Sequence, residues 1–336
     1  MKIAKRIGVV VIDVLLTTSL LLGIYIYNYR MPHNGVPAYA VTQLKQASNT
    51  NLKLTNEKKT KEDWGKKFQD KFSKKIVATD HSYKSPNISI EIKRGRYDSG
   101  IIDYSGKGRH VKLGTEISYT VADIYVKDIR CLQTAFAKDT YGIGYEEKLT
   151  SMSKRLKSIL AVNGDSYSNN RHKDSGTIIR NGVVYRSEKT DMETCVLNWD
   201  GTMQIYQPDE LKINELIKNG AYQSWVFGPS LLDKNGKAKK TFNTWSYIKQ
   251  SHPRTSIGYF EPGHYCLLVV DGRQDKSRGM YLEEEATLFE KLGCKVAYNL
   301  DGGHSSFMTL RNMVMNHPYK SEKQVPDGIF VREFSN

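Results

Sequence analysis

Residues 265–303 read YCLLVVDGRQDKSRGMYLEEEATLFEKLGCKVAYNLDGG. Residues 265–270 are apolar throughout, which is typical of a strand covered on both faces. Residues 280–292 then place apolar side chains on one face of a helix, and Gly293 follows as a C-terminal stop. Residues 296–300 return to a strand. This order predicts a βαβ unit, in which a right-handed crossover joins a parallel pair of strands.

Shorter elements surround this unit. The alternating isoleucines of residues 88–92 predict a half-buried strand, and Asn181-Gly182 predicts a hairpin over residues 177–185. Further elements are expected at 119–126 (strand), 149–157 (helix) and 159–162 (strand). The sequence therefore predicts an α+β fold, a mixed sheet with at least one βαβ unit and with helices packed on it.

A near-continuous apolar run covers residues 7–29 and is long enough to cross roughly 30 Å of hydrocarbon as a helix. It is preceded by Lys2, Lys5 and Arg6. The positive-inside rule then places the N-terminus in the cytoplasm and the rest of the chain outside, as in a single-pass cell-membrane protein. The alternative is a cleaved signal peptide ending near residues 38–40, but that small-residue site lies too far beyond the run.

The chain is expected to divide into four segments. These are a cytoplasmic tip (1–6), a transmembrane anchor (7–29) that contacts the lipid bilayer, a basic and partly helical linker or stalk (30–84), and a large domain (85–336). In the linker, an aromatic residue recurs every four positions, at Trp64, Phe68 and Phe72. A helix with this stripe either lies on an anionic membrane surface or docks on the domain, and docking is the simpler expectation.

The chain has 336 residues and a formal net charge of +14. Such an excess of positive charge favours anionic partners, for example phosphate-bearing polymers or anionic lipid. Nucleic acid is not expected as a partner, because no zinc-finger spacing, RNP signature or basic helix with heptads is present. Four scattered cysteines without a CxxC motif favour buried thiols over a disulfide framework. The sequence does not indicate an oligomeric state.

Three predicted strands end in an acidic or amide residue beside glycine. The turns are Asn163-Gly164-Asp165, Asp271-Gly272-Arg273 and Asn299-Leu300-Asp301-Gly302-Gly303. Ligands of open α/β sheets bind at the carboxyl ends of strands, so these turns could converge on one pocket. Each turn taken alone is more simply explained as a common Asn-Gly or Asp-Gly turn. The last turn continues into His304, Ser305 and Ser306, and this crowding of polar groups favours a functional loop.

Two further residues are candidates for the same pocket. Arg254 begins a predicted strand, and its planar fork of donors suits phosphate oxygens, to which Arg273 and His304 could add charge. Glu284 lies in the first turn of the predicted helix, at the end that faces the side of Asp271. The alternative for Glu284 is that it merely favours the helix dipole together with its acidic neighbours.

Together these residues resemble the phosphodiester glycosidase family, over roughly residues 119–331. The resemblance is carried by Tyr119-Thr120-Val121-Ala122-Asp123-Ile124, Thr134-Ala135-Phe136-Ala137, Asn163-Gly164-Asp165, Arg180-Asn181-Gly182, Phe227-Gly228-Pro229, Arg254-Thr255-Ser256-Ile257-Gly258, Asp271-Gly272-Arg273, Gly279-Met280 with Glu284, and Asn299-Leu300-Asp301-Gly302-Gly303. His304 stands where the family usually has a third glycine. The resemblance implies a hydrolase that cleaves the bond between a sugar's anomeric carbon and a phosphodiester, in a cell-surface or extracellular polysaccharide or glycoconjugate.

The resemblance also suggests roles for individual residues. Glycosidases pair two carboxyl groups, and we expect Asp301 as the main catalytic carboxylate with Glu284 as second acid or base. Sugar hydroxyls would be oriented by Asn163, Asp165 and Asn299, and Arg254 would neutralise the phosphate. The remaining substrate-binding candidates are Asp271, Arg273, Gly302, Gly303, His304 and Ser305.

Two alternatives stay open at the level of sequence. No cofactor or metal is needed for the glycosidase reading, but Asp165, Asp271 and Asp301 could gather around Mg²⁺ or Ca²⁺ in a metal-dependent phosphodiesterase. The same pocket could also belong to a non-catalytic module that recognises wall polymer or exopolysaccharide.

Overall fold

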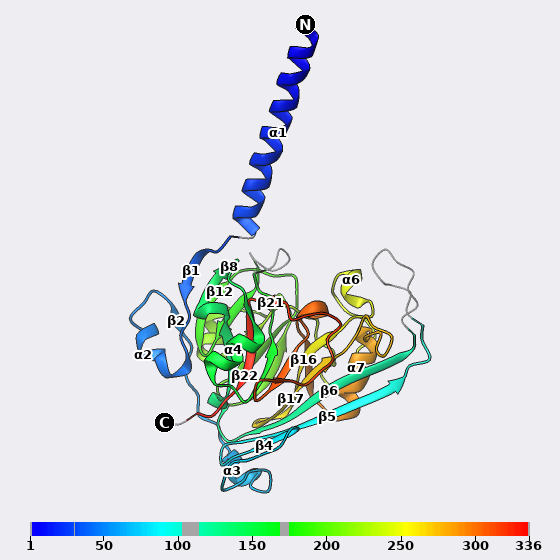
Figure 1. Ribbon diagram of the computed structural model, residues 1–336. Coiled ribbons are helices and arrows are strands. Elements are labelled where there is room, and N and C mark those ends of the chain that lie inside the picture. Colours follow the sequence, from blue (N-terminus) through cyan, green and yellow to red (C-terminus); the bar gives the residue numbers. More distant parts are fainter. Residues whose placement is uncertain (1, 30, 103–113, 169–174, 335–336) are drawn as a thin grey trace.

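The hairpin of β16 (Arg254–Glu261) and β17 (His264–Val270) lies within the largest sheet of the computed structural model (Figure 1), which describes residues 2–29, 31–102, 114–168 and 175–334. Gly263 turns the hairpin with a φ of +87°, a value that glycine adopts without strain. The sheet has seven strands in the order β18 (Val296–Asn299), β16, β17, β6 (Glu116–Val126), β5 (Ile88–Asp98), β4 (Ser82–Lys84) and β3 (Val77–Ala78).

The predicted crossover is present, but its two strands are not neighbours. α7 (Leu282–Leu292) connects β17 to β18 and ends at Gly293, whose φ is +84°. β17 and β18 each pair antiparallel with β16, so they run parallel to one another on either side of it. The expected parallel pair is therefore not formed, because β16, joined to β17 by a two-residue turn that costs little loop entropy, occupies the edge of β17. The strand pairings of the described residues are antiparallel, and the α+β class is confirmed.

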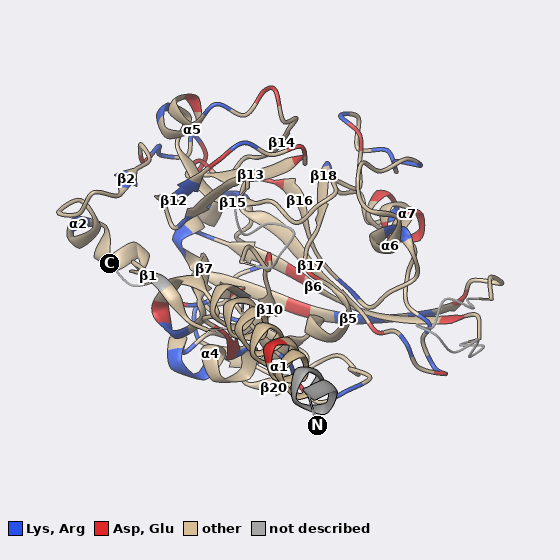
Figure 2. Cartoon of the chain, turned by 90° about the horizontal axis from the view of Figure 1, so that it is seen from above, with Lys and Arg blue, Asp and Glu red and all other residues tan. Residues whose placement is uncertain are grey.

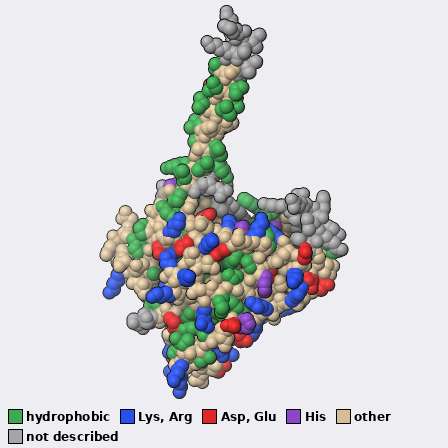
Figure 3. Space-filling model, in the orientation of Figure 1, with side chains coloured by type: hydrophobic (Ala, Val, Ile, Leu, Met, Phe, Trp, Pro, Cys, Tyr) green, Lys and Arg blue, Asp and Glu red, His purple; other side chains and the backbone are tan. Residues whose placement is uncertain are grey.

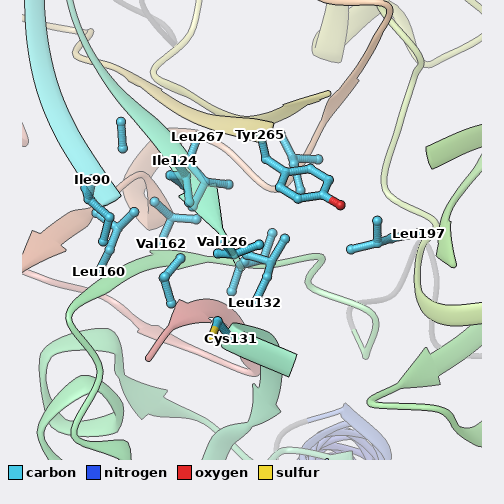
Figure 4. Close-up of a cluster of buried hydrophobic side chains, with 14 of the residues drawn as sticks. Ile90, Ile124, Val126, Cys131, Leu132, Leu160, Val162, Leu197, Tyr265 and Leu267 are labelled. Carbon is cyan, nitrogen blue, oxygen red and sulfur yellow. The ribbon is translucent and has the colours of Figure 1, made fainter. Parts of the chain in front are cut away.

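A second sheet of five strands packs against the first. Its order is β20 (Met313–Val314), β19 (Met308–Leu310), β10 (Leu160–Asn163), β22 (Asp327–Val331) and β7 (Leu132–Phe136). The main core lies between the two sheets, where Ile90, Ile124 and Leu267 meet Leu160 and Val162 (Figure 4). These side chains alternate along their strands, so one face of each strand enters this core, and the other face of β10 and of β17 is buried in separate clusters.

Smaller sheets and short helices complete the body. One sheet has three strands in the order β11 (Thr177–Arg180), β12 (Val183–Ser187) and β2 (Lys53–Leu54), and another has the order β14 (Met203–Tyr206), β13 (Thr194–Asn198) and β15 (Ala221–Trp225). A two-stranded sheet is formed by β21 (Gln324–Val325) and β9 (Glu147–Lys148). The helices are α2 (Leu44–Ala47), α4 (Leu149–Leu156), α5 (Ile213–Asn219) and α6 (Ser246–Lys249). The predicted hairpin is confirmed as β11–β12, with positive φ at both Asn181 and Gly182.

The segment before residue 85 contributes strands to the body. β1 (His33–Pro37) pairs with β8 (Thr140–Ile143), β2 pairs with β12, and β3 and β4 extend the seven-stranded sheet. The expected boundary at residue 85 therefore falls inside that sheet. The aromatic stripe lies around the short helix α3 (Trp64–Lys67), and Trp64 and Phe68 are buried in the main core. These two side chains therefore dock on the domain and are not exposed for contact with a membrane surface.

One long helix projects away from the body. α1 (Lys2–Tyr29) contains an apolar stretch, Gly8–Asn28, with a mean hydropathy of 2.3 and no burial against the rest of the chain. In Figure 3 hydrophobic side chains line the part of the helix that is drawn in colour, whereas most of the charged side chains in view lie on the body. The helix is long and apolar enough to span a membrane, which is compatible with a single-pass anchor or with a signal peptide.

Candidate active site

One cavity brings together residues from distant parts of the chain. Its volume is about 190 Å³, and its charged or titratable lining residues are Asp301, Arg254, Arg273, Lys323, His252, His304 and Tyr247. The lining is completed by Phe227, Ile248, Pro253, Gly302, Gly303 and Ser305. Among these described residues, three permanent cations face one carboxylate, and such a cavity favours an anionic ligand.

The strand order explains this convergence. Because β16 lies between β17 and β18 and runs against both, its first residue, Arg254, lies beside the carboxyl ends of its two neighbours. The Asp301 loop is then joined to the start of β16 by backbone hydrogen bonds. Leu300 N–H donates to Thr255 O at 2.8 Å, and Gly303 N–H donates to Pro253 O at 2.8 Å.

Asp301 is the carboxylate of the cavity. Its side chain is half-buried, and burial raises the pKa of this carboxyl group above its usual range. The positive charge of Lys323 and hydrogen bonds from the Ser305 and Ser166 hydroxyls act in the opposite direction. The backbone is fixed as well, since Asp301 N–H donates to Gly164 O at 3.1 Å. The carboxylate is thus held in place beside a cation.

Asn163 supports the loop from behind and does not line the cavity. Its Nδ2 donates to Asp301 O at 2.6 Å, and its Oδ1 accepts from the Thr255 hydroxyl at 2.7 Å. The side chain is fully buried. The predicted contact of Asn163 with a sugar hydroxyl is therefore replaced by a role in positioning Asp301.

Asp165 and Asn299 are also committed to the protein interior. Asp165 accepts hydrogen bonds from Val226 N–H and Phe227 N–H and lies 3.6 Å from Arg180, and burial raises its pKa. Asn299 donates to Gly228 O at 2.8 Å, and among the described residues its buried Oδ1 has no partner. Neither side chain lines the cavity, and both are fully buried.

Arg254 is buried and lines the cavity. Its Nε donates to Met280 O at 3.0 Å, and its Nη2 donates to Ile248 O and Gln250 O. Among the described residues, no group accepts a hydrogen bond from Nη1. The predicted role in phosphate binding thus fits the geometry, since the guanidinium is rigid and keeps one donor nitrogen available.

Arg273 and His304 lie at the same cavity. Arg273 Nη1 donates to the Tyr319 hydroxyl at 2.8 Å, and Nη2 approaches His252 Nδ1 at 3.2 Å. A guanidinium cannot accept, so His252 Nδ1 must be the acceptor. His304 Nε2 lies 2.6 Å from Ser321 O, and its ring is tilted against Tyr319. The imidazole in place of the family's glycine therefore forms part of the cavity wall.

Two predicted site residues lie elsewhere. Asp271 accepts from His317 N–H at 2.8 Å and from the Asn316 amide at 3.2 Å, and it closes a turn outside the cavity. Glu284 accepts from Tyr281 N–H at 2.9 Å and forms an ion pair with buried Arg278. The position of Glu284 as a second acid in the cavity is corrected, because its carboxylate caps α7 and faces another depression. Asp301 alone among Asp165, Asp271 and Asp301 lines the cavity.

Sequence reasoning missed several residues of this site. His252 and Pro253 directly precede Arg254, and this adjacency could have indicated that they line the same site. Lys323 lies in a loop without a motif and reaches the cavity only through tertiary folding. Glu285 is one of the acidic neighbours of Glu284, for which the sequence suggests only an interaction with the helix dipole, yet its side chain is fully buried and lies 3.7 Å from Arg254.

The fold and the site define an α+β protein with a cation-rich cavity around one carboxylate. Residues 157–332, more than half of the chain, match the family model described as phosphodiester glycosidase. The chain belongs to the phosphodiester glycosidase family, which is a family of hydrolases.

Similar proteins have been found by sequence and by structure. A SPbeta prophage-derived uncharacterized protein, YomE of Bacillus subtilis (strain 168), is 33% identical over 193 residues, which are 56% of this chain and 29% of that protein. The chain thus spans less than a third of this curated relative.

Two solved structures share the fold. The catalytic domain of zebrafish N-acetylglucosamine-1-phosphodiester alpha-N-acetylglucosaminidase, auto-inhibited by its pro-peptide, has a TM-score of 0.53 at 19% identity over 75% of this chain and 90% of that domain. A hypothetical protein from Synechocystis has a TM-score of 0.51 at 13% identity, over 74% of this chain and 63% of that one. At these identities the likeness concerns the fold alone.

Proposed function

We propose that this protein hydrolyses a glycosyl phosphodiester, with Asp301 as the catalytic carboxylate. The observation that carries the proposal is the shared cavity, in which Asp301 faces Arg254, Arg273 and Lys323. A sugar phosphodiester needs both features, since negative charge grows on the phosphate while positive charge grows on the sugar in the transition state.

The reaction breaks the bond between the anomeric carbon and the phosphate oxygen. The electron pair of that bond stays on the phosphate, whose growing charge the Arg254 guanidinium and its cationic neighbours stabilise. Water supplies the new oxygen at the anomeric carbon. As base, the Asp301 carboxylate takes the proton of this water while the new C–O bond forms, and later releases the proton to solvent. As nucleophile, the carboxylate first bonds to the anomeric carbon, and water then breaks that bond, releases its proton to solvent and regenerates the carboxylate. A phosphate leaving group is far less basic than an alcohol, so a second carboxylic acid is not required. This accounts for the single carboxylate among the described residues that line the cavity.

The Asp301 assignment is tested by substitution. We expect Asp301→Asn to lower the rate of hydrolysis of a glycosyl phosphodiester by about 100-fold or more, because the amide cannot accept a proton. The matched control is Asp80→Asn, which makes the same chemical change at an exposed position. Product release is measured for both variants and wild type. Wild-type turnover by the Asp301 variant would reject the role, and binding without turnover in wild type would favour a non-catalytic module.

We also propose that α1 anchors the domain to the cell membrane, with its N-terminus in the cytoplasm and the domain outside. The apolar stretch Gly8–Asn28 and the basic residues before it support this orientation. A cell-surface or extracellular polysaccharide or glycoconjugate is then the substrate class. Protease added to intact cells should remove the domain and leave a short membrane fragment. A fully protected chain would show the opposite orientation, and a soluble chain lacking α1 would show cleavage.

A further inference from the structure

A buried carboxylate, Glu285, lies beside Arg254, one of the residues that line the cavity. Glu285 belongs to the first turn of α7, which lies in the same region of the body as α6 in Figures 1 and 2. Its neighbour Glu283 is exposed and Glu284 caps the helix, but the Glu285 side chain is fully buried. A carboxylate in such a place is costly unless its charge is compensated. We therefore expect a neighbouring positive charge to compensate the carboxylate of Glu285.

The contacts of Glu285 point to Arg254. Its Oε1 accepts a short hydrogen bond from the Ser256 hydroxyl, and its Oε2 lies 3.7 Å from Arg254 Nε. Within the described part of the chain Oε2 has no hydrogen-bond partner, because Arg254 Nε donates to Met280 O instead. Glu285 and Arg254 thus interact through their charges.

This ion pair affects the cavity. Arg254 is almost fully buried, and burial lowers its pKa, whereas the carboxylate of Glu285 raises it. Among the described residues, Glu285 supplies the ion pair of Arg254, and Glu285 itself is buried and is not among the residues that line the cavity. The positive charge that Arg254 offers to a ligand is therefore reduced whenever Glu285 is ionised.

We propose that Glu285 is a positioning residue that holds Arg254 and sets how much of its positive charge is available to an anion in the cavity. This inference rests on the proposed function in one respect, that the natural anion in the cavity is the phosphate group of the substrate. It concerns anion binding, which can be measured without turnover.

The charge state of Glu285 changes near neutral pH. Burial raises the pKa of Glu285 to about 7, and Arg254 and the Ser256 hydroxyl oppose this rise. Below this pH the protonated side chain leaves the charge of Arg254 uncompensated, and an anion binds more tightly. Above it the carboxylate competes with the anion, and binding weakens. The other charged or titratable groups that act on Arg254 are Arg273, Glu284 and Tyr247.

The experiment measures binding of sulfate, whose own charge is constant across neutral pH, to the full chain in detergent. Wild type, Glu285→Gln and the exposed control Glu283→Gln are compared at about pH 6 and about pH 8. Between about pH 6 and about pH 8, we expect the dissociation constant for sulfate to rise in all three proteins. The rise in wild type and in Glu283→Gln should be about three- to tenfold larger than the rise in Glu285→Gln. The histidines that line the cavity are common to all three proteins, so the difference reports on Glu285.

A second variant makes the test independent of the stability of Glu285→Gln. Ser256→Ala removes the hydrogen bond that favours the ionised carboxylate, so the pH at which sulfate binding weakens should move upward. Equal pH dependence in wild type and Glu285→Gln, or an unmoved midpoint in Ser256→Ala, would overturn the proposal. A protein that shows the predicted sulfate profile but no hydrolysis would overturn the proposed function alone.

Discussion

Gly303 illustrates how closely the backbone of the Asp301 loop approaches a functional side chain. Its φ is +67°, and a Cβ atom there would lie 3.1 Å from Arg273 Nη2. A side chain at this position is therefore strained and also displaces the guanidinium by a few tenths of an ångström. The loop needs glycine for both reasons.

Gly303→Ala should consequently affect both stability and activity. We expect a loss of about 1 kcal/mol in the free energy of unfolding and about a tenfold loss in hydrolysis, because the cation is misplaced. Gly293→Ala is the matched control, since Gly293 has a φ of +84° but no atom within 4 Å of the added Cβ. The control should lose stability only. Equal activity in the two variants would show that the approach of Arg273 to the loop is irrelevant.

At the scale of elements, a buried charge network joins β11, β22 and the turn after β10. Arg180 donates to Asp327 at 2.7 Å and lies 3.6 Å from Asp165, and all three side chains are buried. Asp327 also accepts from Asp165 N–H at 2.9 Å. The network holds the strand end behind Asp301, so it positions the site without touching a ligand.

Asp327→Ala should therefore destabilise the whole domain. Removing one partner leaves Arg180 buried with less compensation, and such losses amount to about 3–5 kcal/mol. The control is Asp70→Ala, which breaks an exposed ion pair with Lys71 and should cost about 1 kcal/mol or less. Urea unfolding of both variants measures the difference. Similar midpoints would mean that the buried network contributes little to stability.

At the scale of the whole molecule, the segment between α1 and residue 85 belongs to the folded body. β1 and β2 pair with strands of the body, and the Trp64 side chain is buried to 1% exposure. Without this segment the seven-stranded sheet also loses β3 and β4. The folded unit thus begins just after the projecting helix.

Two truncated chains test this arrangement. A chain that starts at Met31 should be soluble and show the cooperative unfolding of a single domain, because it keeps every strand of the body. A chain that starts at Ser85 should fail to fold or unfold at much lower urea, since loss of a buried tryptophan alone costs about 3–5 kcal/mol. Circular dichroism and urea titration check both. Equal stability would place the boundary at residue 85 after all.

Much of the fold and part of the site follow from local patterns. The helix that ends at Gly293, the hairpin at Asn181-Gly182 and the apolar strand 265–270 are specified by periodicity and turn chemistry, which act over a few residues. The placement of Asp301 and Arg254 in one cavity was also predicted, because residues at the ends of adjacent buried strands lie at the same edge of the sheet.

Which side chains face the cavity was decided only by the tertiary structure. Glu284 and Glu285 are adjacent in sequence, yet one caps a helix and the other lies behind Arg254. Likewise β16, and not β18, pairs with β17, and this exchange places Arg254 next to the Asp301 loop. Periodicity fixes that a residue is inside or outside, whereas its partner depends on which strands become neighbours, and strand pairing is set by contacts between distant segments.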